Sequence, residues 1–440
     1  MKYRNGVVCI VLISCLLVLI QAPNSQGKPN ASMKFSSVRE ENPRAGGQET
    51  LILPYAFPSD SMGTTIGVGG LRKGFFQDQL LLAGALFGSA DSAYGLVLGM
   101  WDLAVLPSSD RFYFSAIGSA GHYPRQKAYA EVNPVHGTRA GSNDSDKDDF
   151  IEKEGDDNWW EMKLEYVLPI GAMSDSGMAT YKLKNGILAS GATGGEQWNP
   201  LASGATVLLL RQFNRYQTYE TKVGDLEGTM HPLEFGLLYN NTDFYSNPST
   251  GSSQYLSFTK DFAWLDSEET WTFLQFEASK YFSFGSSDHA RQRVVALNLW
   301  TGSSPSWETS VDENGDEIIS HNPPFLEGAK LGGFYRFRAY PNNRFNDRSV
   351  LYTTAEYRYT PKWNPIGEVS WLRWLKMDWM QLVAFVEGGR VADEYSDLFS
   401  DWKGDVGFGF RAMMAGAVVR FDYAVSDEGS AGWVMFGQPF

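Results

Sequence analysis

The sequence is poor in the residues that build disulfides, metal sites and nucleic-acid interfaces. Its 440 residues include two cysteines and five histidines, and 51 Asp and Glu outnumber 37 Lys and Arg, which gives a net charge of −14. Both cysteines, Cys9 and Cys15, lie in the first apolar run, and the histidines show no H-x3-H spacing. Disulfide scaffolds, C-x-x-C redox sites and cysteine-ligated zinc are therefore excluded, and no basic surplus is present to neutralise the phosphates of a nucleic acid.

Long hydrophobic runs are also scarce. A basic pair, Lys2 and Arg4, precedes an apolar run that ends at Ile20, and small polar residues follow, which predicts a Sec-type signal peptide over residues 1–27. Beyond this signal no apolar run approaches the length of a membrane-spanning helix. Residues 28–50 are polar and rich in turn formers, and we expect them to form a flexible N-terminal tail.

Motifs of catalysis and nucleotide binding are missing as well. No G-x-S-x-G, HExxH, Walker or Rossmann pattern occurs. Asp144, Asp146 and Asp148 have a calcium-like spacing, but the Gly and Glu of an EF-hand loop do not follow, so we interpret this stretch as a solvated acidic loop. We expect no catalytic residue, no cofactor and no metal ion. A lipid hydrolase would require a Ser–His pair on a lipid-facing rim, and no sequence signal marks one.

Glycine and aromatic residues are abundant, and from about residue 50 apolar side chains alternate with polar ones. The clearest stretch places Val406, Phe408, Phe410 and Ala412 on one face and Asp405, Gly407, Gly409 and Arg411 on the other. This period of two, interrupted by turn-forming clusters, predicts a chain made of β-strands.

A soluble β-sandwich and a membrane β-barrel could both give this alternation. Two features favour the barrel: Tyr, Trp and Phe fringe the apolar faces as an interfacial girdle would, and the strands are about 9–11 residues long with charge and glycine on the opposite face. Closing the sheet also removes its unpaired edges. We therefore predict an all-β fold, a transmembrane antiparallel β-barrel over residues 51–440.

We expect about 16 strands in this barrel. Fifteen are predicted near residues 62–72, 79–89, 92–104, 111–120, 158–168, 204–213, 231–241, 253–261, 269–282, 291–300, 349–360, 380–391, 404–414, 417–425 and 431–440. Single-chain bacterial barrels have an even number of strands, so we place one more near residues 178–188. The predicted seam then joins strand 62–72 to strand 431–440.

The long connection over residues 301–348 carries the sequence Phe337-Arg338-Ala339-Tyr340 after Leu331-Gly332-Gly333. This segment resembles the (V/L)RG(F/Y) loop motif of the Omp85 superfamily, which includes the D15 surface antigens and the BamA/TamA-like barrels. Phe385-Val386-Glu387-Gly388-Gly389 resembles the family's F-x-[D/E]-x-G strand motif, and the stretch that ends at Phe440 resembles its last hairpin. Order and spacing agree from about residue 230 to 440, while Ala339 stands where the family usually has Gly.

The resemblance implies a role for each motif residue. The loop over 301–348 would fold into the lumen, where Arg338 would pair with Glu387 and the rings of Phe337 and Tyr340 would wedge against the wall. Phe385 belongs to the same anchoring strand, and Gly388 and Gly389 would let the loop approach that strand closely. The terminal aromatic Phe440 would act as an assembly signal. From the pattern alone, Arg338 could equally face solvent on an external loop.

The resemblance also implies a function and a set of partners. We expect an outer-membrane barrel without POTRA domains that inserts or translocates a polypeptide or amphiphile through the lumen loop and a lateral seam. The location would be the outer membrane of a Gram-negative-type cell, in contact with lipid and lipopolysaccharide. Expected protein partners are the barrel-assembly machinery and a separate periplasmic partner or secreted substrate, without nucleic acid. The alternative is a passive channel or surface antigen without active translocation.

Overall fold

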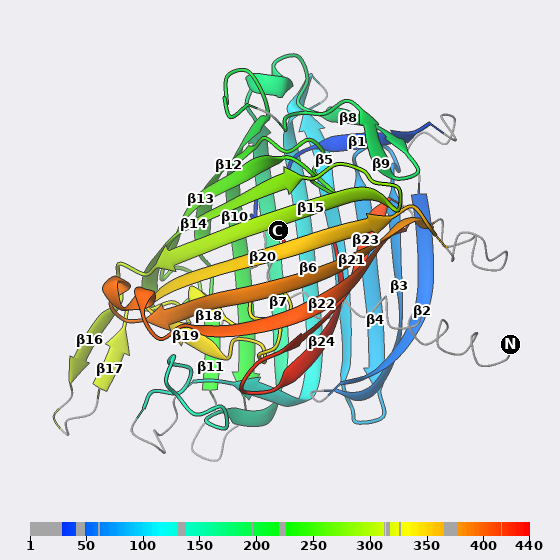
Figure 1. Cartoon of the computed structure of the whole chain (residues 1–440). Helices are drawn as coiled ribbons and strands as arrows, with labels where there is room; N and C mark the ends of the chain where they lie inside the picture. Colours follow the sequence, from blue (N-terminus) through cyan, green and yellow to red (C-terminus); the bar gives the residue numbers. More distant parts are fainter. Residues whose placement is uncertain are drawn as a thin grey trace, which may run out of the picture.

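The computed structural model describes residues 29–40, 49–59, 62–106, 108–130, 138–195, 197–219, 226–311, 313, 317–324, 327–364, 377–414 and 416–440. Nearly all regular structure in these ranges is β-strand (Figure 1). Within them no helix is both long enough and apolar enough to span a membrane. The expected signal peptide over residues 1–27 lies outside the described residues.

Antiparallel pairings join sixteen strands, each to the next along the chain, and together they form the wall of a barrel. These strands are β2 (Glu49–Ser59), β3 (Gly63–Lys73), β4 (Leu81–Ser89), β5 (Tyr94–Leu106), β6 (Ser109–Ala128), β7 (Ile151–Val167), β10 (Ala205–Tyr219), β12 (Leu233–Asn240), β13 (Gly251–Phe262), β14 (Thr270–Ser283), β15 (Ala290–Ser303), β20 (Ser349–Pro361), β21 (Met377–Ala392), β22 (Lys403–Met414), β23 (Ala417–Val425) and β24 (Ser430–Phe436). A short strand, β11 (Leu226–Met230), extends the sheet along β10. The prediction of an all-β antiparallel barrel is confirmed.

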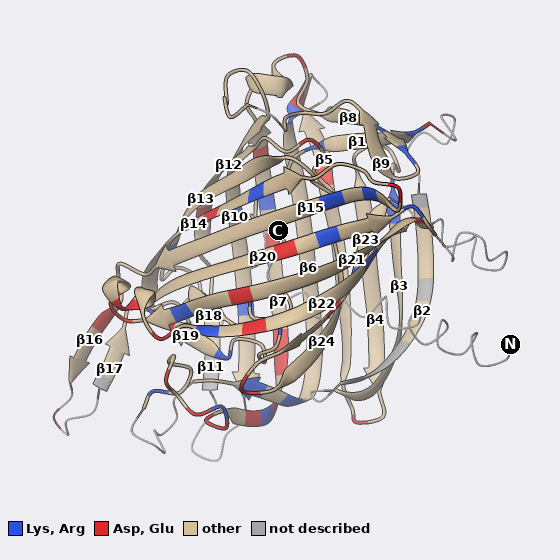
Figure 2. Ribbon diagram, viewed as in Figure 1, with Lys and Arg blue, Asp and Glu red and all other residues tan. Residues whose placement is uncertain are grey.

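The two faces of the wall have opposite chemistry. On β20, Glu356 and Arg358 are fully buried, while Tyr357 between them is 43 % exposed. On β22, Asp405 is buried and Val406 is 53 % exposed. Large apolar side chains point outward on most of the other wall strands too, and charged residues occur along the strands as well as in the loops (Figure 2). This distribution suits a barrel surrounded by lipid and excludes a sandwich, whose apolar side chains would be buried between two sheets.

All fifteen strands predicted from the alternation are present, but the sixteenth was misplaced. Residues near 178–188 form β8 (Ala179–Lys184) and β9 (Ile187–Ser190), which are not strands of the wall but belong to a separate sheet. The missing wall strand is β2. Its prolines, Pro54 and Pro58, interrupt the pattern because proline lacks a backbone N–H and is rare within sheets. The seam therefore lies between β2 and β24, and not at strand 62–72.

Two different sets of elements lie at the two ends of the barrel (Figure 1). At one end, which we call the terminal end, β1 (Phe35–Arg39) pairs with β8 and β8 pairs with β9, beside the 3-10 turn η3 (Gly171–Met173). At the other end, the loop end, β16 (Glu308–Val311) and β17 (Glu317–Ser320) form a hairpin, and β18 (Ala329–Leu331) pairs with β19 (Phe345–Asp347). A second 3-10 turn, η5 (Tyr395–Phe399), follows β21.

The prediction of a flexible tail over residues 28–50 is wrong for the part that the structure describes. Residues 29–40 run inside the terminal end and include β1, and Glu49 already belongs to β2. Ala31 and Met33 are almost completely buried. Polar composition suggested disorder, but here the polar side chains bind charged groups of the barrel interior.

The last strand is shorter than predicted. β24 ends at Phe436, and Gly437 adopts a φ of 77°, which turns the chain away from the strand direction. Gln438 is buried and donates a hydrogen bond from Nε2 to Asn247 Oδ1 (3.1 Å). The ring of Phe440 lies 6.3 Å from that of Tyr281, and the four last residues therefore fold inward.

Candidate functional site

The candidate site is a plug of residues 332–344 inside the barrel, which we call the lumen plug. β18 and β19 form its neck, where Leu331 pairs with Phe345. The chain turns sharply at Gly332 and Gly333, both at a φ of 113°. A Cβ atom on Gly332 would lie 2.2 Å from the carbonyl oxygen of Pro341, so this turn requires glycine.

The tip of the plug is the predicted motif segment. Phe337, Arg338, Ala339 and Tyr340 are all buried, and the structure therefore does not place Arg338 in solvent. The left-handed residue of the tip is Phe337, with a φ of 58°, whereas Ala339 is absent from the residues with positive φ among those described. A methyl group at position 339 thus causes no backbone strain, although glycine is the usual residue in the family.

Arg338 and Glu387, predicted as partners, lie in direct contact. The backbone N–H of Arg338 donates to Glu387 Oε2 (2.7 Å), and its Nε donates to Oε1 (3.0 Å). The guanidinium also reaches Glu356 and Asp422, at 2.9 and 2.8 Å from Nη1. Its central carbon lies 3.4 Å from the centre of the Phe385 ring, which is a cation–π contact. One loop residue is thereby held by β20, β21 and β23.

The anchor belongs to a larger network of buried charges. Arg411 contacts Glu356 at 2.7 Å, and Arg358 contacts it at 2.8 Å through Nε. Arg420 pairs with Asp422. Removal of one member of such a network leaves the opposite charge buried and uncompensated, at a cost of about 3–5 kcal/mol. The network therefore favours a single position of the plug.

Aromatic rings pack around the tip as the motif predicted. The ring of Phe337 lies 5.1 Å from that of Tyr340 and 5.9 Å from that of Tyr352, whose hydroxyl also bonds to Glu387. The Tyr340 hydroxyl donates to Asp427 Oδ1 (2.9 Å). Apolar packing and polar contacts thus fix the same short segment.

The plug also contacts the last strand and the turn before it. Trp433 of β24 donates from Nε1 to the carbonyl oxygen of Arg338 (2.7 Å). Phe334 packs against Met435 in a small apolar cluster. At the turn between β23 and β24, Arg344 binds Glu428 through two hydrogen bonds of 2.7 and 2.9 Å. The plug is therefore joined to the wall on one side of the seam.

The motif glycines have a different role from the one predicted. A Cβ atom on Gly389 would lie 2.4 Å from the carbonyl oxygen of Leu351 on β20, and one on Gly388 would lie 3.1 Å from the Trp402 ring. These glycines make room for the neighbouring strand and an aromatic side chain, and not for the plug. The expectation that they let the loop approach closely is wrong.

Phe440 is placed in the interior at the terminal end. Its ring centre lies 5.0 Å from the guanidinium carbon of Arg358, and it packs on Tyr281, Val294 and Ala296. The ring is therefore not part of the lipid-facing row of β24. Its role as an assembly signal stays a prediction.

A second occupant of the lumen was missed by sequence reasoning. Lys34, in residues 29–40, contacts Asp102 of β5 and Glu165 of β7, both at 2.6 Å. Burial disfavours its charge, but the two carboxylates hold the pKa of Lys34 above its ordinary value. The alternation around Glu161 and Glu165, with Met162 and Leu164 outward, already marked these acids as interior residues. Nothing in the sequence marked their partner.

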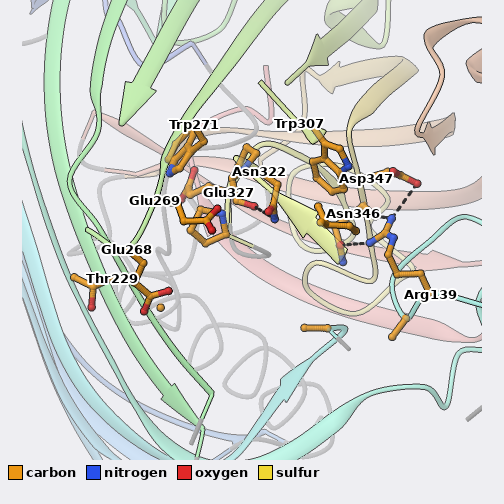
Figure 3. Close-up of a pocket in the computed structure, with 16 residues that line it drawn as sticks. Arg139, Thr229, Glu268, Glu269, Trp271, Trp307, Asn322, Glu327, Asn346 and Asp347 are labelled. Atoms are coloured by element: carbon orange, nitrogen blue, oxygen red, sulfur yellow. Dashed lines mark hydrogen bonds and ion pairs between the residues drawn. The ribbon is translucent and has the colours of Figure 1, made fainter. Parts of the chain in front are cut away.

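A cavity of about 420 Å³ lies at the loop end, beside the neck of the plug (Figure 3). Its lining includes Trp271, Trp307 and Glu327. Arg139 pairs with Asp347 at 2.9 Å and thereby ties the connection after β6 to the neck. Aromatic and acidic side chains therefore line the interior at this end.

The Omp85 superfamily domain matches residues 207–432, from β10 to β24, which is half of the chain. The chain belongs to the Omp85 superfamily. The match includes the lumen plug and its anchor strand. No curated protein matches the sequence.

Three solved Omp85 barrels resemble the fold. CdiB from Escherichia coli is 11 % identical, with a TM-score of 0.51 over 89 % of this chain and 61 % of that chain. CdiB from Acinetobacter baumannii is 12 % identical (TM-score 0.47; 89 % and 58 % covered), and BamA from Haemophilus ducreyi lacking POTRA domains 1–3 is 11 % identical (TM-score 0.46; 88 % and 70 % covered). The chain thus spans about three fifths of the two CdiB chains, and these likenesses concern the fold alone.

Proposed function

We propose that this Omp85 barrel inserts or translocates polypeptides at the outer membrane, with the lumen plug and the β2–β24 seam as its moving parts. The observation that supports this most directly is the set of contacts of Arg338. Its side chain holds the plug to the wall through Glu387, and its carbonyl oxygen binds Trp433 of the last strand. Movement of the plug would therefore loosen the strand that borders the seam.

The proposal sets the terminal end in the periplasm. An exported barrel with an even number of strands that inserts from the periplasm keeps both ends of its wall on that side. The connection that carries the plug then belongs to the outer surface, where the longer loops of such barrels usually lie. The connection between β7 and β10, which carries β8 and β9, would lie on the periplasmic side. In this orientation a separate periplasmic partner would deliver the substrate to the terminal end, and lipopolysaccharide would surround the loop end.

The composition of the seam supports lateral opening. Pro54 and Pro58 of β2 cannot donate backbone hydrogen bonds, and Gly432 of β24 adds little packing. Phe436 of β24 packs against the apolar cluster that includes Leu51 of β2. Opening would expose unpaired backbone groups to hydrocarbon, so a seam with fewer possible bonds opens at lower cost.

A cross-link across the seam tests the proposal. We would combine Leu51→Cys with Phe436→Cys, join the thiols with a short bismaleimide in proteoliposomes, and measure insertion of an unfolded eight-stranded barrel protein as the probe. The expected result is a fall to the rate of liposomes without protein. The control is Leu51→Cys with Leu71→Cys, which are direct partners on β2 and β3 and whose linkage leaves the seam free. Full activity of the seam-linked barrel would overturn the proposal.

The second candidate is a passive channel or a surface antigen without translocation. The plug and residues 29–40 fill the interior from opposite ends, which favours a mostly closed barrel over a steadily open pore. Conductance in planar bilayers separates the candidates: a large, steady open current in the unaltered chain would favour the passive channel.

A further inference from the structure

Residues 29–40, which we call the N-terminal insert, are bound inside the terminal end as an extended peptide ligand would be. β1 runs parallel to β8, with Phe35 opposite Ala179 and Arg39 opposite Leu183. Backbone hydrogen bonds continue beyond the strand at both ends, from Ala179 N–H to the Lys34 carbonyl and from Glu40 N–H to the Leu183 carbonyl, each 2.9 Å. This is strand addition to a sheet edge, a common mode of peptide recognition.

Alternate residues of the insert face two different surfaces. Asn30, Ser32 and Lys34 face carboxylates of the wall, whereas Ala31 and Met33 pack into an apolar cluster formed by β8 and the interior of the barrel. Backbone pairing accepts many sequences, and the two surfaces add side-chain preferences at alternate positions. The arrangement combines general affinity for an extended chain with selection at a few positions.

Three acidic residues of the wall provide the polar contacts. Glu234 of β12 accepts two hydrogen bonds from Asn30 Nδ2, at 2.8 and 3.0 Å. Glu165 accepts the backbone N–H of Ser32 at 2.7 Å and pairs with Lys34, which also contacts Asp102. The carboxylates of Asp102 and Glu165 thus share one ammonium group. An incoming segment would have to supply a Lys or Arg at the same place.

The insert can leave without breaking the wall. β1 is an edge strand of the three-stranded sheet β1–β8–β9 and takes no part in the barrel pairings. Its departure would expose one edge of β8 and the three carboxylates together. A cavity of about 210 Å³ beside Ala31 and Phe35 would accept larger side chains than those of the insert.

We propose that the β8 edge with Asp102, Glu165 and Glu234 is a binding site for an extended, Lys- or Arg-containing polypeptide segment, and that the N-terminal insert occupies it as an intramolecular competitor. The peptide binding itself is independent of translocation. That the natural ligand is a translocated polypeptide rests on the proposed function above. The site would then receive substrate at the terminal end, before the lumen plug moves.

Peptide binding to the full chain in detergent micelles tests this site. The probe is a fluorescent peptide with the sequence of residues 29–40, and its binding is followed by anisotropy. The Lys34→Glu variant weakens the internal competitor, so we expect it to bind the probe at least tenfold more tightly than the unaltered chain does. A matched peptide with Glu in place of its Lys should bind at least tenfold more weakly to both proteins. Heat-modifiable migration in gels checks that the barrel is folded.

A second measurement detects exchange without weakening the insert. Met33→Cys places a thiol at a buried position of the insert, and a membrane-impermeant maleimide reports when it becomes accessible. Excess probe peptide should accelerate labelling at least tenfold, and the Glu-containing peptide should not. Equal binding of both peptides, or labelling that is unchanged by either, would overturn the proposal. Peptide binding without any insertion activity would instead reject only the proposed function.

Discussion

Arg338 binds Glu387 through both its backbone and its side chain, so the pair fixes the position and the direction of the loop tip together. The two bonds are 2.7 and 3.0 Å long and are fully buried. A side-chain contact alone would hold a long, flexible arginine but leave the backbone of the loop free. The double contact explains how thirteen plug residues keep one place inside a wide barrel.

Arg338→Ala should open the barrel and destabilise it. The substitution leaves Glu387, Glu356 and Asp422 without their shared cation, so we expect the free energy of unfolding to fall by about 3–5 kcal/mol. Planar-bilayer recordings should show frequent large openings in place of a mostly closed state. The control is Arg348→Ala, since Arg348 is one-third exposed and lies 3.7 Å from Asp393. A closed Arg338→Ala barrel would show that other contacts suffice to hold the plug.

The coupling between Arg338 and Glu387 can be measured in a double-mutant cycle. We expect Glu387→Gln to destabilise the barrel less than Arg338→Ala does, because the amide still accepts the Arg338 backbone N–H. The two effects should be non-additive by about 0.5–3 kcal/mol, as is usual for residues in one hydrogen-bond network. Urea unfolding of all four proteins in the same detergent gives the coupling. Strict additivity would mean that the two residues act independently.

Gly332→Ala should disturb the plug more than Ala339→Gly. A methyl group on residue 332 would lie 2.2 Å from the Pro341 carbonyl oxygen. The backbone of residue 332 also has a φ of 113°, so the neck must rearrange to accept alanine. Ala339→Gly restores the usual family residue at a position without positive φ and should lower stability by only about 0.4–1 kcal/mol, because glycine loses more chain entropy on folding. Conductance and urea unfolding should both separate the two variants. If the two variants had the same conductance and the same stability in urea, the requirement for glycine at position 332 would be contradicted.

Lys330, in the neck of the plug, should make stability depend on pH. Burial lowers its pKa from 10.5 to about 7, against the opposing attraction of Glu327. Because the folded-state pKa lies below the unfolded one, the unfolded chain binds more protons between pH 7 and 10.5, and this residue's contribution to stability rises with pH across that interval.

Lys330→Met removes this ionisable group while keeping a long side chain. The free energy of unfolding of Lys330→Met should therefore exceed that of the unaltered chain by most below pH 7. This difference should shrink towards pH 10.5. Urea unfolding at pH 6, 8 and 10 measures the difference. Lys403→Met serves as the control because Lys403, at the start of β22, is only partly buried. A stability difference between Lys330→Met and the unaltered chain that is constant across this range would contradict the assigned pKa.

Local sequence was sufficient for most of the wall. The alternation on β20, β21 and β22 by itself separates the buried acids and arginines from the outward-facing Tyr, Leu and Phe side chains. It failed at β2, where Pro54 and Pro58 hide the period, and near residues 178–188, where β8 alternates equally well but packs inside the barrel. A period of two shows that a segment is a strand but does not show which sheet it joins.

The plug and its anchor were predictable through the motif, whereas the N-terminal insert was not. Arg338 and Glu387 belong to short patterns with a known arrangement, and the structure places them together. Lys34 lies in a segment whose polar composition predicts disorder. Its partners Asp102 and Glu165 belong to strands far along the chain.

The sequence by itself determined a chain of about sixteen amphipathic strands whose ionic side chains face inward. Alternation along a strand is a local property, so it can be read from neighbouring residues. Only the tertiary structure decided what occupies the interior: a plug from one end, the N-terminal insert from the other, and the inward turn of the last four residues. Those choices depend on charges and cavities that distant strands create together once the barrel is formed.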